Sequence, residues 1–160
     1  MHEQEKIALR KALRRQRAQL TREQVAAASE AVARQILACD AFRKAKSVMG
    51  FLAFGKELGV DAVLTAALAM GKTVAVPHII SATSFEPVRL KNMQDFDLDH
   101  YGIRTVRPPL EELAPEGLDL VLVPGVAYDC LLQASLPTDE HDVKMQYIVS
   151  ESGIITLAPL

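Results

Sequence analysis

The chain has 160 residues, of which 49% are hydrophobic, and its formal net charge is −2. This length and composition predict a single globular domain, residues 1–160, with a sizeable core. The small net charge argues against nucleic acid or an anionic membrane as a partner, and no apolar run reaches the roughly eighteen residues of a membrane span. We therefore expect neither of these partners, and we expect the chain to be a monomer.

The two cysteines, Cys39 and Cys130, are far apart in the sequence and form no C-x-x-C pair. They predict free thiols in a reducing compartment rather than a disulfide framework. The first residues are charged rather than apolar, so no signal peptide is expected. These features together favour a cytoplasmic protein.

Residues 3 to 19 predict an amphipathic helix, because apolar residues recur at helical spacing with no Gly or Pro between them. Basic residues separated by four, four and three positions share one face of this helix: Lys6, Arg10, Arg14 and Arg17. Two interpretations remain open for this face. It is either a solvated helix surface or a clamp for an anion.

Thr21 followed by Gln24 matches a capping box and predicts the start of a second helix, Arg22 to Ala38. After it, Ser47 to Phe54 is short and apolar, as in a buried strand. A third helix is predicted over Val60 to Met70, with Gly71 just past its end. Thr73 to Val76 then predicts a second strand that stops at Pro77.

This strand, helix and strand have the length of a βαβ crossover, so the two strands should be parallel and should end at the same edge of the sheet. Glu57 and His78 follow those strands and are expected to face a crevice there. The apolar run Leu118 to Val123 predicts a central strand buried on both faces, which stops at Pro124. Its exit, Gly125 to Asp129, is a place to look for chemistry, although the pattern on its own favours a simple turn over a site.

Other segments carry weaker patterns. Residues 84 to 90 predict a short strand, and residues 92 to 107 show no clear periodicity around a Tyr101-Gly102 turn. Pro108 to Leu113 predicts a short helical turn, and residues 147–149 and 154–155 predict edge strands. The sequence as a whole predicts an α/β fold, a three-layer Rossmann-like arrangement with a mostly parallel central sheet and an N-terminal helical segment.

Several kinds of site are not supported. The sequence contains neither standard phosphate-binding glycine motif, nor the G-x-S-x-G turn of a serine hydrolase. Residues 139–142 contain three acids and a histidine, but adjacent side chains point in different directions, so no metal site is assigned. No catalytic residue is assigned from the pattern either.

An ordered set of segments resembles the 5-formyltetrahydrofolate cyclo-ligase family, also called methenyltetrahydrofolate synthetase. The set spans nearly the whole chain, and its V-P-G-V-A-Y-D segment is the most specific member. Its segments are Lys6 to Arg10, Glu57, Gly71 to Pro77, Tyr101 to Arg104, Leu120 to Asp129, and Leu136 to Val143.

The resemblance implies ATP-dependent ring closure of 5-formyltetrahydrofolate to 5,10-methenyltetrahydrofolate, with ADP and phosphate released and Mg²⁺ accompanying ATP. Phosphorylation makes the formyl carbon electrophilic, so the enzyme mainly positions its substrates and neutralises phosphate charge. Carried over by motif, Lys6 and Arg10 would contact the ATP phosphates. Glu57 would lie at the folate pocket, and Asp129 is a candidate for the same crevice.

The chain also departs from the family pattern. About forty residues that include a glycine-rich segment, whose backbone amides would cradle the triphosphate, are missing between Asp129 and Leu136. Where the family tends to have E-V-D-T, this chain has Glu57 to Val60 reading E-L-G-V. Either the protein carries a deletion or the sequence omits the segment. The rival expectation is a non-catalytic homologue that binds folate, nucleotide or a partner protein without turnover.

Overall fold

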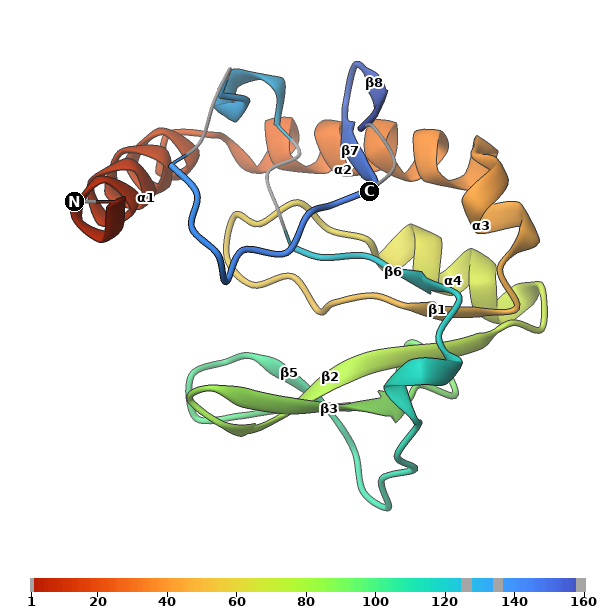
Figure 1. The fold of residues 1–160 in the computed structure, drawn as a ribbon. Coiled ribbons are helices and arrows are strands. Elements are labelled where there is room, and N and C mark those ends of the chain that lie inside the picture. The colour runs from red at the N-terminus through yellow and green to blue at the C-terminus, as the bar shows by residue number, and fades with distance from the viewer. Residues whose placement is uncertain (1, 125–127, 134–136, 158–160) are drawn as a thin grey trace.

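The computed structural model describes residues 2–124, 128–133 and 137–157 (Figure 1). Its helices are α1 (His2–Ala18), α2 (Arg22–Ala38), α3 (Asp40–Lys44) and α4 (Asp61–Ala69), with 3₁₀ turns η1 (Pro115–Gly117) and η2 (Asp129–Leu131). Its strands are β1 (Ser47–Met49), β2 (Thr73–Ser81), β3 (Ser84–Arg89), β4 (Phe96–Leu98), β5 (Arg104–Val106), β6 (Leu120–Val121), β7 (Tyr147–Ser150) and β8 (Gly153–Thr156). The predicted helices of the first 70 residues and the capping box are all confirmed.

The central sheet has the order β3-β2-β1-β6. β1 pairs in parallel with both β2 and β6, and β2 pairs antiparallel with β3. The sheet is therefore mostly parallel, as predicted, and the α/β fold class is confirmed. Because β1 and β6 are parallel neighbours, the segments that follow them leave the sheet at the same edge.

Helix α2 begins where the sequence predicts because the side chains of Thr21 and Gln24 each accept a hydrogen bond from the other residue's backbone N–H. The Gln24 N–H donates to Thr21 Oγ1 at 3.1 Å, and the Thr21 N–H donates to Gln24 Oε1 at 2.8 Å. One face of the helix buries Ala28, Val32 and Ile36 in the core. α2 lies across the upper part of the molecule in Figure 1, above α4 and the sheet strands.

The core is built from α2, α3, α4 and the central sheet. Phe42, Val48 and Leu64 are fully buried, and all three residues of β1 are buried. A strand covered on both faces has little room for polar alternation, which explains why Val48 and Met49 follow each other without a polar residue between them. Burial of these side chains is the main force that fixes α2 and α4 against the sheet.

The prediction that the second strand stops at Pro77 is wrong, because β2 continues to Ser81. Pro77 lies opposite Pro87 in the antiparallel pair with β3. The carbonyl of Pro87 accepts from the Leu113 N–H on the outer side of β3, so this proline pair points its backbone away from the β2–β3 ladder. Neither proline needs to donate a ladder hydrogen bond, and the strand can pass through both.

The predicted helical turn at residues 108–113 is also wrong. This segment runs along the outer edge of β3, where the Arg89 N–H donates to the Glu111 carbonyl at 2.8 Å and Glu112 forms a bridge with Val88. Strand-edge donors that would otherwise be unpaired outweigh the weak local preference for a helix. β1 and β6 are likewise shorter than the runs that predicted them. The prediction that Leu118 to Val123 forms a central strand buried on both faces is wrong, because β6 lies at the edge of the described sheet and Val121 is 50% exposed.

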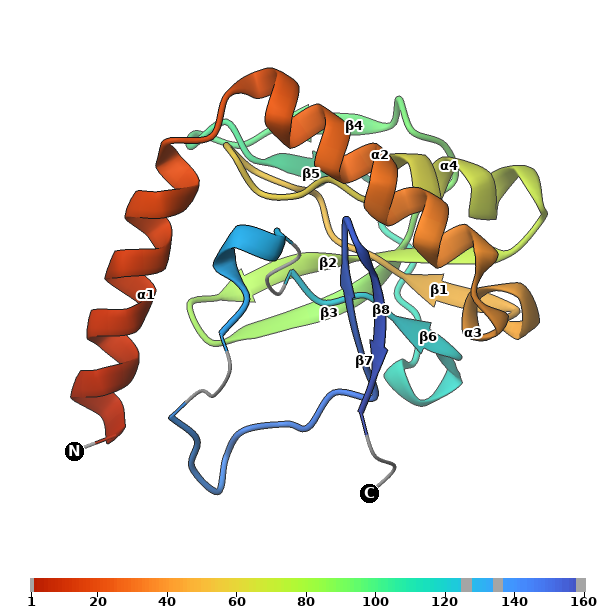
Figure 2. The same ribbon diagram turned by 90° about the horizontal axis from the view of Figure 1, so that it is seen from above.

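Two hairpins complete the fold. β4 and β5 pair across a turn in which Gly102 has a φ of 76°, and Arg104 of β5 binds Asp61 of α4 through two hydrogen bonds of 2.7 and 2.9 Å. Within the described residues, β7 and β8 pair only with each other, and they pack on α2, as the view in Figure 2 shows. In the described part of the chain, no helix is long and apolar enough to cross a membrane.

Candidate functional site

A hollow of about 310 Å³ opens between α1 and the ends of β1 and β6. It combines three arginines of α1 with an acid, two aromatic rings and an apolar floor. Its lining residues are Arg10, Leu13, Arg14, Arg17, Phe51, Glu57, Leu58, Pro124, Tyr128 and Leu131. The hollow thus lies at the sheet edge where the sequence predicts a crevice.

The basic face of α1 forms one wall of this hollow. Arg17 and Leu13 are half-buried, whereas Arg10 and Arg14 are exposed. Arg10 has one long ion pair with Glu3 at 3.9 Å, between two exposed side chains. Such a pair contributes little stability, so the Arg10 guanidinium remains available to an anion.

Glu57 lies on the opposite wall, in a tight turn after β1. Its N–H donates to the Phe54 carbonyl at 3.1 Å, and its Oε2 accepts from the Phe54 N–H at 3.0 Å. Gly55 takes a φ of 61° within this turn, a conformation that favours glycine. The Lys56 ammonium donates to the Ala18 carbonyl and fastens the turn to the C-terminal end of α1.

Tyr128 closes the floor between these walls. It is only 3% exposed, and its hydroxyl donates to the Lys56 carbonyl at 3.0 Å. Burial raises the pKa of the Tyr128 hydroxyl, while the nearby positive charge of Arg17 acts in the opposite direction. The phenol therefore stays neutral near pH 7 and holds the Glu57 turn in place through its hydrogen bond.

Lys6 does not line the hollow. It lies in the N-terminal part of α1, whereas the Glu57 turn is fastened to the C-terminal end of that helix. Its ammonium donates to Asp139 Oδ2 at 2.6 Å and to Asp142 Oδ2 at 2.7 Å. The hydrogen bond to Asp139 is the main reason why the pKa of Lys6 is raised, and Lys6 holds the pKa of both carboxyl groups below their usual range. These contacts join the N-terminal helix to the segment that follows η2.

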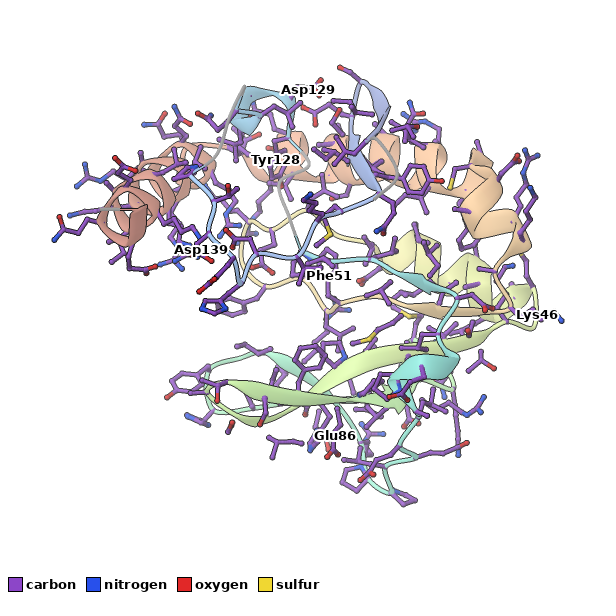
Figure 3. All side chains as sticks on the ribbon, in the orientation of Figure 1. Lys46, Phe51, Glu86, Tyr128, Asp129 and Asp139 are labelled. Carbon is purple, nitrogen blue, oxygen red and sulfur yellow. The ribbon has the colours of Figure 1, made fainter. Side chains whose placement is uncertain are left out.

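Asp129 is not brought to the hollow. Figure 3 shows it at the outer end of the molecule, beyond Tyr128, and its carboxylate accepts from the Ser152 hydroxyl in the β7–β8 turn. Hydrogen bonds from Ser150 and then Ser152 hold the pKa of Asp129 below its usual range. His78 does not line the hollow either. The rest of the predicted exit, Gly125 to Ala127, lies outside the described residues.

Two other features carry less weight. A larger hollow of about 600 Å³ is a shallow depression along the outer surface of α1 alone. Among the residues that the structure describes, no group of three His, Cys, Asp or Glu side chains could hold a metal ion. Both cysteines are free thiols, and Cys39 Sγ accepts the Phe42 N–H at the start of α3.

Sequence reasoning missed the aromatic part of the site. Phe51 lies in the predicted strand Ser47 to Phe54 and Tyr128 in the predicted exit loop Gly125 to Asp129, but their apolar character did not indicate that they line a hollow. The i, i+4, i+7 spacing of Arg10, Arg14 and Arg17 did indicate a shared face. What it did not indicate is which end of that face is half-buried.

Comparisons with known proteins agree with this fold. A relative from Caenorhabditis elegans, named as a probable 5-formyltetrahydrofolate cyclo-ligase, is 29% identical over 132 residues, which is 77% of this chain but only 63% of the relative. The chain thus spans less than two thirds of that protein's length. The NMR structure of 5,10-methenyltetrahydrofolate synthetase from Aquifex aeolicus superposes with a TM-score of 0.76 at 21% identity, over 96% of this chain and 93% of that one. The family model of 5-formyltetrahydrofolate cyclo-ligases matches residues 2–133, and the chain therefore belongs to that family.

Proposed function

We propose that this protein is a monomeric, single-domain cytoplasmic enzyme that closes 5-formyltetrahydrofolate to 5,10-methenyltetrahydrofolate at the expense of ATP. Family membership gives the reaction class. The observation that supports it on this chain is the hollow itself, in which three arginines face Glu57 and two aromatic rings. A phosphorylated intermediate attached to a flat heterocycle needs this combination of cations and apolar surface.

The chemistry has two steps. The formyl oxygen forms a bond to the γ-phosphorus of ATP while the bond from that phosphorus to the ADP oxygen breaks, and its electrons leave with ADP. N10 then attacks the activated carbon and loses its proton to solvent, and the carbon–oxygen bond breaks to release phosphate. The protein must align the two substrates and stabilise charge on the moving phosphoryl group.

In this proposal Lys6 and Arg10 bind the ATP phosphates. The lightly paired Arg10 fits an anion directly, whereas Lys6 must exchange Asp139 and Asp142 for phosphate oxygens. Mg²⁺ would enter with the nucleotide, held mainly by phosphate oxygens and water, and would neutralise part of the triphosphate charge. Among the described residues, basic side chains are available to the ATP phosphates, but no group of three acidic, His or Cys side chains could hold the metal ion by itself.

Glu57 is proposed to bind the folate. Its carboxylate already accepts the Phe54 N–H through Oε2, which leaves Oε1 free to accept an N–H of the pterin ring. Phe51 and Tyr128 supply rings against which the heterocycle can pack. Asp129 remains a weaker candidate, because its carboxylate is engaged by the β7–β8 turn.

A second candidate function is a binder without turnover. It is favoured by the expected loss of the glycine-rich segment, because the sequence between Asp129 and Leu136 contains no glycine. Without the backbone amides of that segment, ATP would be held by side chains alone.

Thermal stabilisation by each ligand separately discriminates the two candidates, because a ligand that binds only the folded state raises the melting temperature. The enzyme is expected to respond to 5-formyltetrahydrofolate and to Mg-ATP. Glu57→Gln should reduce only the folate response, and Arg10→Ala only the nucleotide response, with Arg22→Ala as the surface control. A folate response without any nucleotide response would contradict the enzyme and support the binder.

A further inference from the structure

Arg17 is the half-buried arginine of the hollow, and the proposed roles of Lys6, Arg10 and Glu57 leave it unused. We propose that Arg17 binds the phosphoryl group as it passes from ATP to the folate, and so acts as a catalytic residue of this site. The inference rests on the proposed function and names a phosphoryl subsite inside the hollow. Four observations support it.

The first observation is that Arg17 has no partner of its own. Among the residues described by the structure, its guanidinium has neither an ion pair nor a hydrogen bond, and the same holds for Arg14. Arginine cannot lose its proton in a protein, so a half-buried, unpaired guanidinium must keep its charge at a cost. An anionic ligand would remove that cost.

The second observation is the position of Arg17 near the buried Tyr128 hydroxyl. Its field acts on the buried Tyr128 hydroxyl, on which the carboxylates of Glu57 and Glu151 also act. Yet neither acid forms an ion pair with Arg17. These two carboxylates therefore do not occupy the donors of the guanidinium.

The third observation is the order of the groups along α1. The Lys56 contact with Ala18 fastens the Glu57 turn beside the C-terminal end of the helix, next to Arg17. Lys6 lies eleven residues earlier, which is about 16 Å along the helix axis. If ATP lies at the Lys6 end and folate at the Glu57 end, the transferred phosphoryl group must meet the folate near Arg17.

The fourth observation is chemical. A guanidinium presents several N–H donors in a planar fork that matches two phosphate oxygens, and it is less strongly hydrated than an ammonium. As the formyl oxygen takes the γ-phosphoryl group from ADP, negative charge spreads over three phosphoryl oxygens. Arg17 would donate to two of them before the carbon–oxygen bond breaks, and then to the released phosphate.

The test uses inorganic phosphate as the probe and the full chain as the protein. Phosphorus-31 NMR titration at low ionic strength measures phosphate binding to the wild type and to Arg17→Ala, Arg17→Lys and Arg15→Ala. Arg15 is the matched control, because it is an exposed arginine of α1 that does not line this hollow. We expect Arg17→Ala to weaken phosphate binding at least tenfold, Arg17→Lys to weaken it less, and Arg15→Ala to change it less than twofold.

Turnover supplies the second readout. Arg17→Ala should lower kcat by about 10²- to 10³-fold with the KM values of ATP and folate nearly unchanged, and added guanidinium ion should restore part of the rate. Phosphate binding that is equal in the wild type and Arg17→Ala, or absent from the wild type, overturns the proposal. Phosphate binding lost in Arg17→Ala from a wild type without turnover would instead uphold the subsite and reject the proposed function.

Discussion

Gly50 stands where β1 ends and the chain turns toward the hollow, and replacing it by alanine tests how tightly this end of the strand is packed. Its N–H donates to the Ala75 carbonyl at 2.9 Å, and the next residue, Phe51, lines the hollow. A Cβ at position 50 would lie 2.5 Å from Leu64 Cδ2 and 3.3 Å from Leu64 Cγ. Ordinary contact begins at 3.4 Å, so the overlap with the leucine is severe.

Leu64 is fully buried, so its side chain can move away from a new methyl group only by shifting its neighbours in the core. We therefore expect Gly50→Ala to lower the free energy of unfolding by about 1–3 kcal/mol, the usual cost of overpacking a core. The reduced entropy of the unfolded alanine chain opposes this by about 0.4–1 kcal/mol, so the lower half of that range is expected. Gly50 has no positive φ, so backbone strain adds nothing.

Urea denaturation of a double-mutant cycle provides the assay. Leu64→Ala alone should cost about 2–5 kcal/mol through the cavity it leaves. In that background Gly50→Ala should be nearly neutral, because the colliding methyl groups are gone. Gly117→Ala is the matched control, since a Cβ there would contact nothing within 4 Å. Costs that simply add, within about 0.5 kcal/mol, would refute the packing argument.

Three further predictions concern the helix cap, the strand entry and the folate wall. Thr21→Ala removes the capping box of α2 and should lower the free energy of unfolding by about 1 kcal/mol in urea titrations; no loss would contradict the cap's role. Asp119 accepts the Lys46 and Ser47 N–H groups, which hold the pKa of its carboxyl below the usual 3.8, so its stabilisation is present above pH 3.8 and lost as the pH falls through the lowered pKa. Urea titrations of Asp119→Asn should therefore show a deficit at pH 7 that shrinks below pH 3.8, and a deficit independent of pH would contradict this. Glu57→Gln should raise the KM for 5-formyltetrahydrofolate about tenfold, as expected for roughly 1.4 kcal/mol of lost hydrogen bonding, with the KM for ATP unchanged. Equal changes in both KM values would contradict the proposal that Glu57 binds the folate.

Local signals predicted the fold well where they were strong. The capping box at Thr21, Gly71 after α4 with a φ of 72°, and the parallel β1–α4–β2 unit all follow from short-range patterns. The failures have tertiary causes. Pro77 did not end β2 because its backbone faces away from the ladder, and the segment after Pro108 became a strand partner because β3 had free donors. Neither fact is visible in the sequence.

The site was predicted in part. The spacing of Arg10 and Arg17 correctly placed them on one face, and the position of Glu57 after a strand led to the same hollow. Long-range contacts could not be foreseen. The pairing of Lys6 with Asp139 spans 133 positions, and the hydrogen bond between Ser152 and Asp129 depends on where the β7–β8 hairpin packs. Sequence patterns therefore do not specify which of several possible partners a charged side chain such as Lys6 or Asp129 will bind.

The most direct test of the proposed reaction is the growth of methenyl-folate absorbance in the near ultraviolet when the purified protein, its intact mass confirmed near 17.5 kDa, meets 5-formyltetrahydrofolate and Mg-ATP. We expect growth that requires ATP and is lost in the Lys6→Ala, Arg10→Ala double variant, but not in Arg22→Ala. Absence of growth from a folded protein of this mass would contradict the catalytic claim and leave a cyclo-ligase fold that binds without turnover.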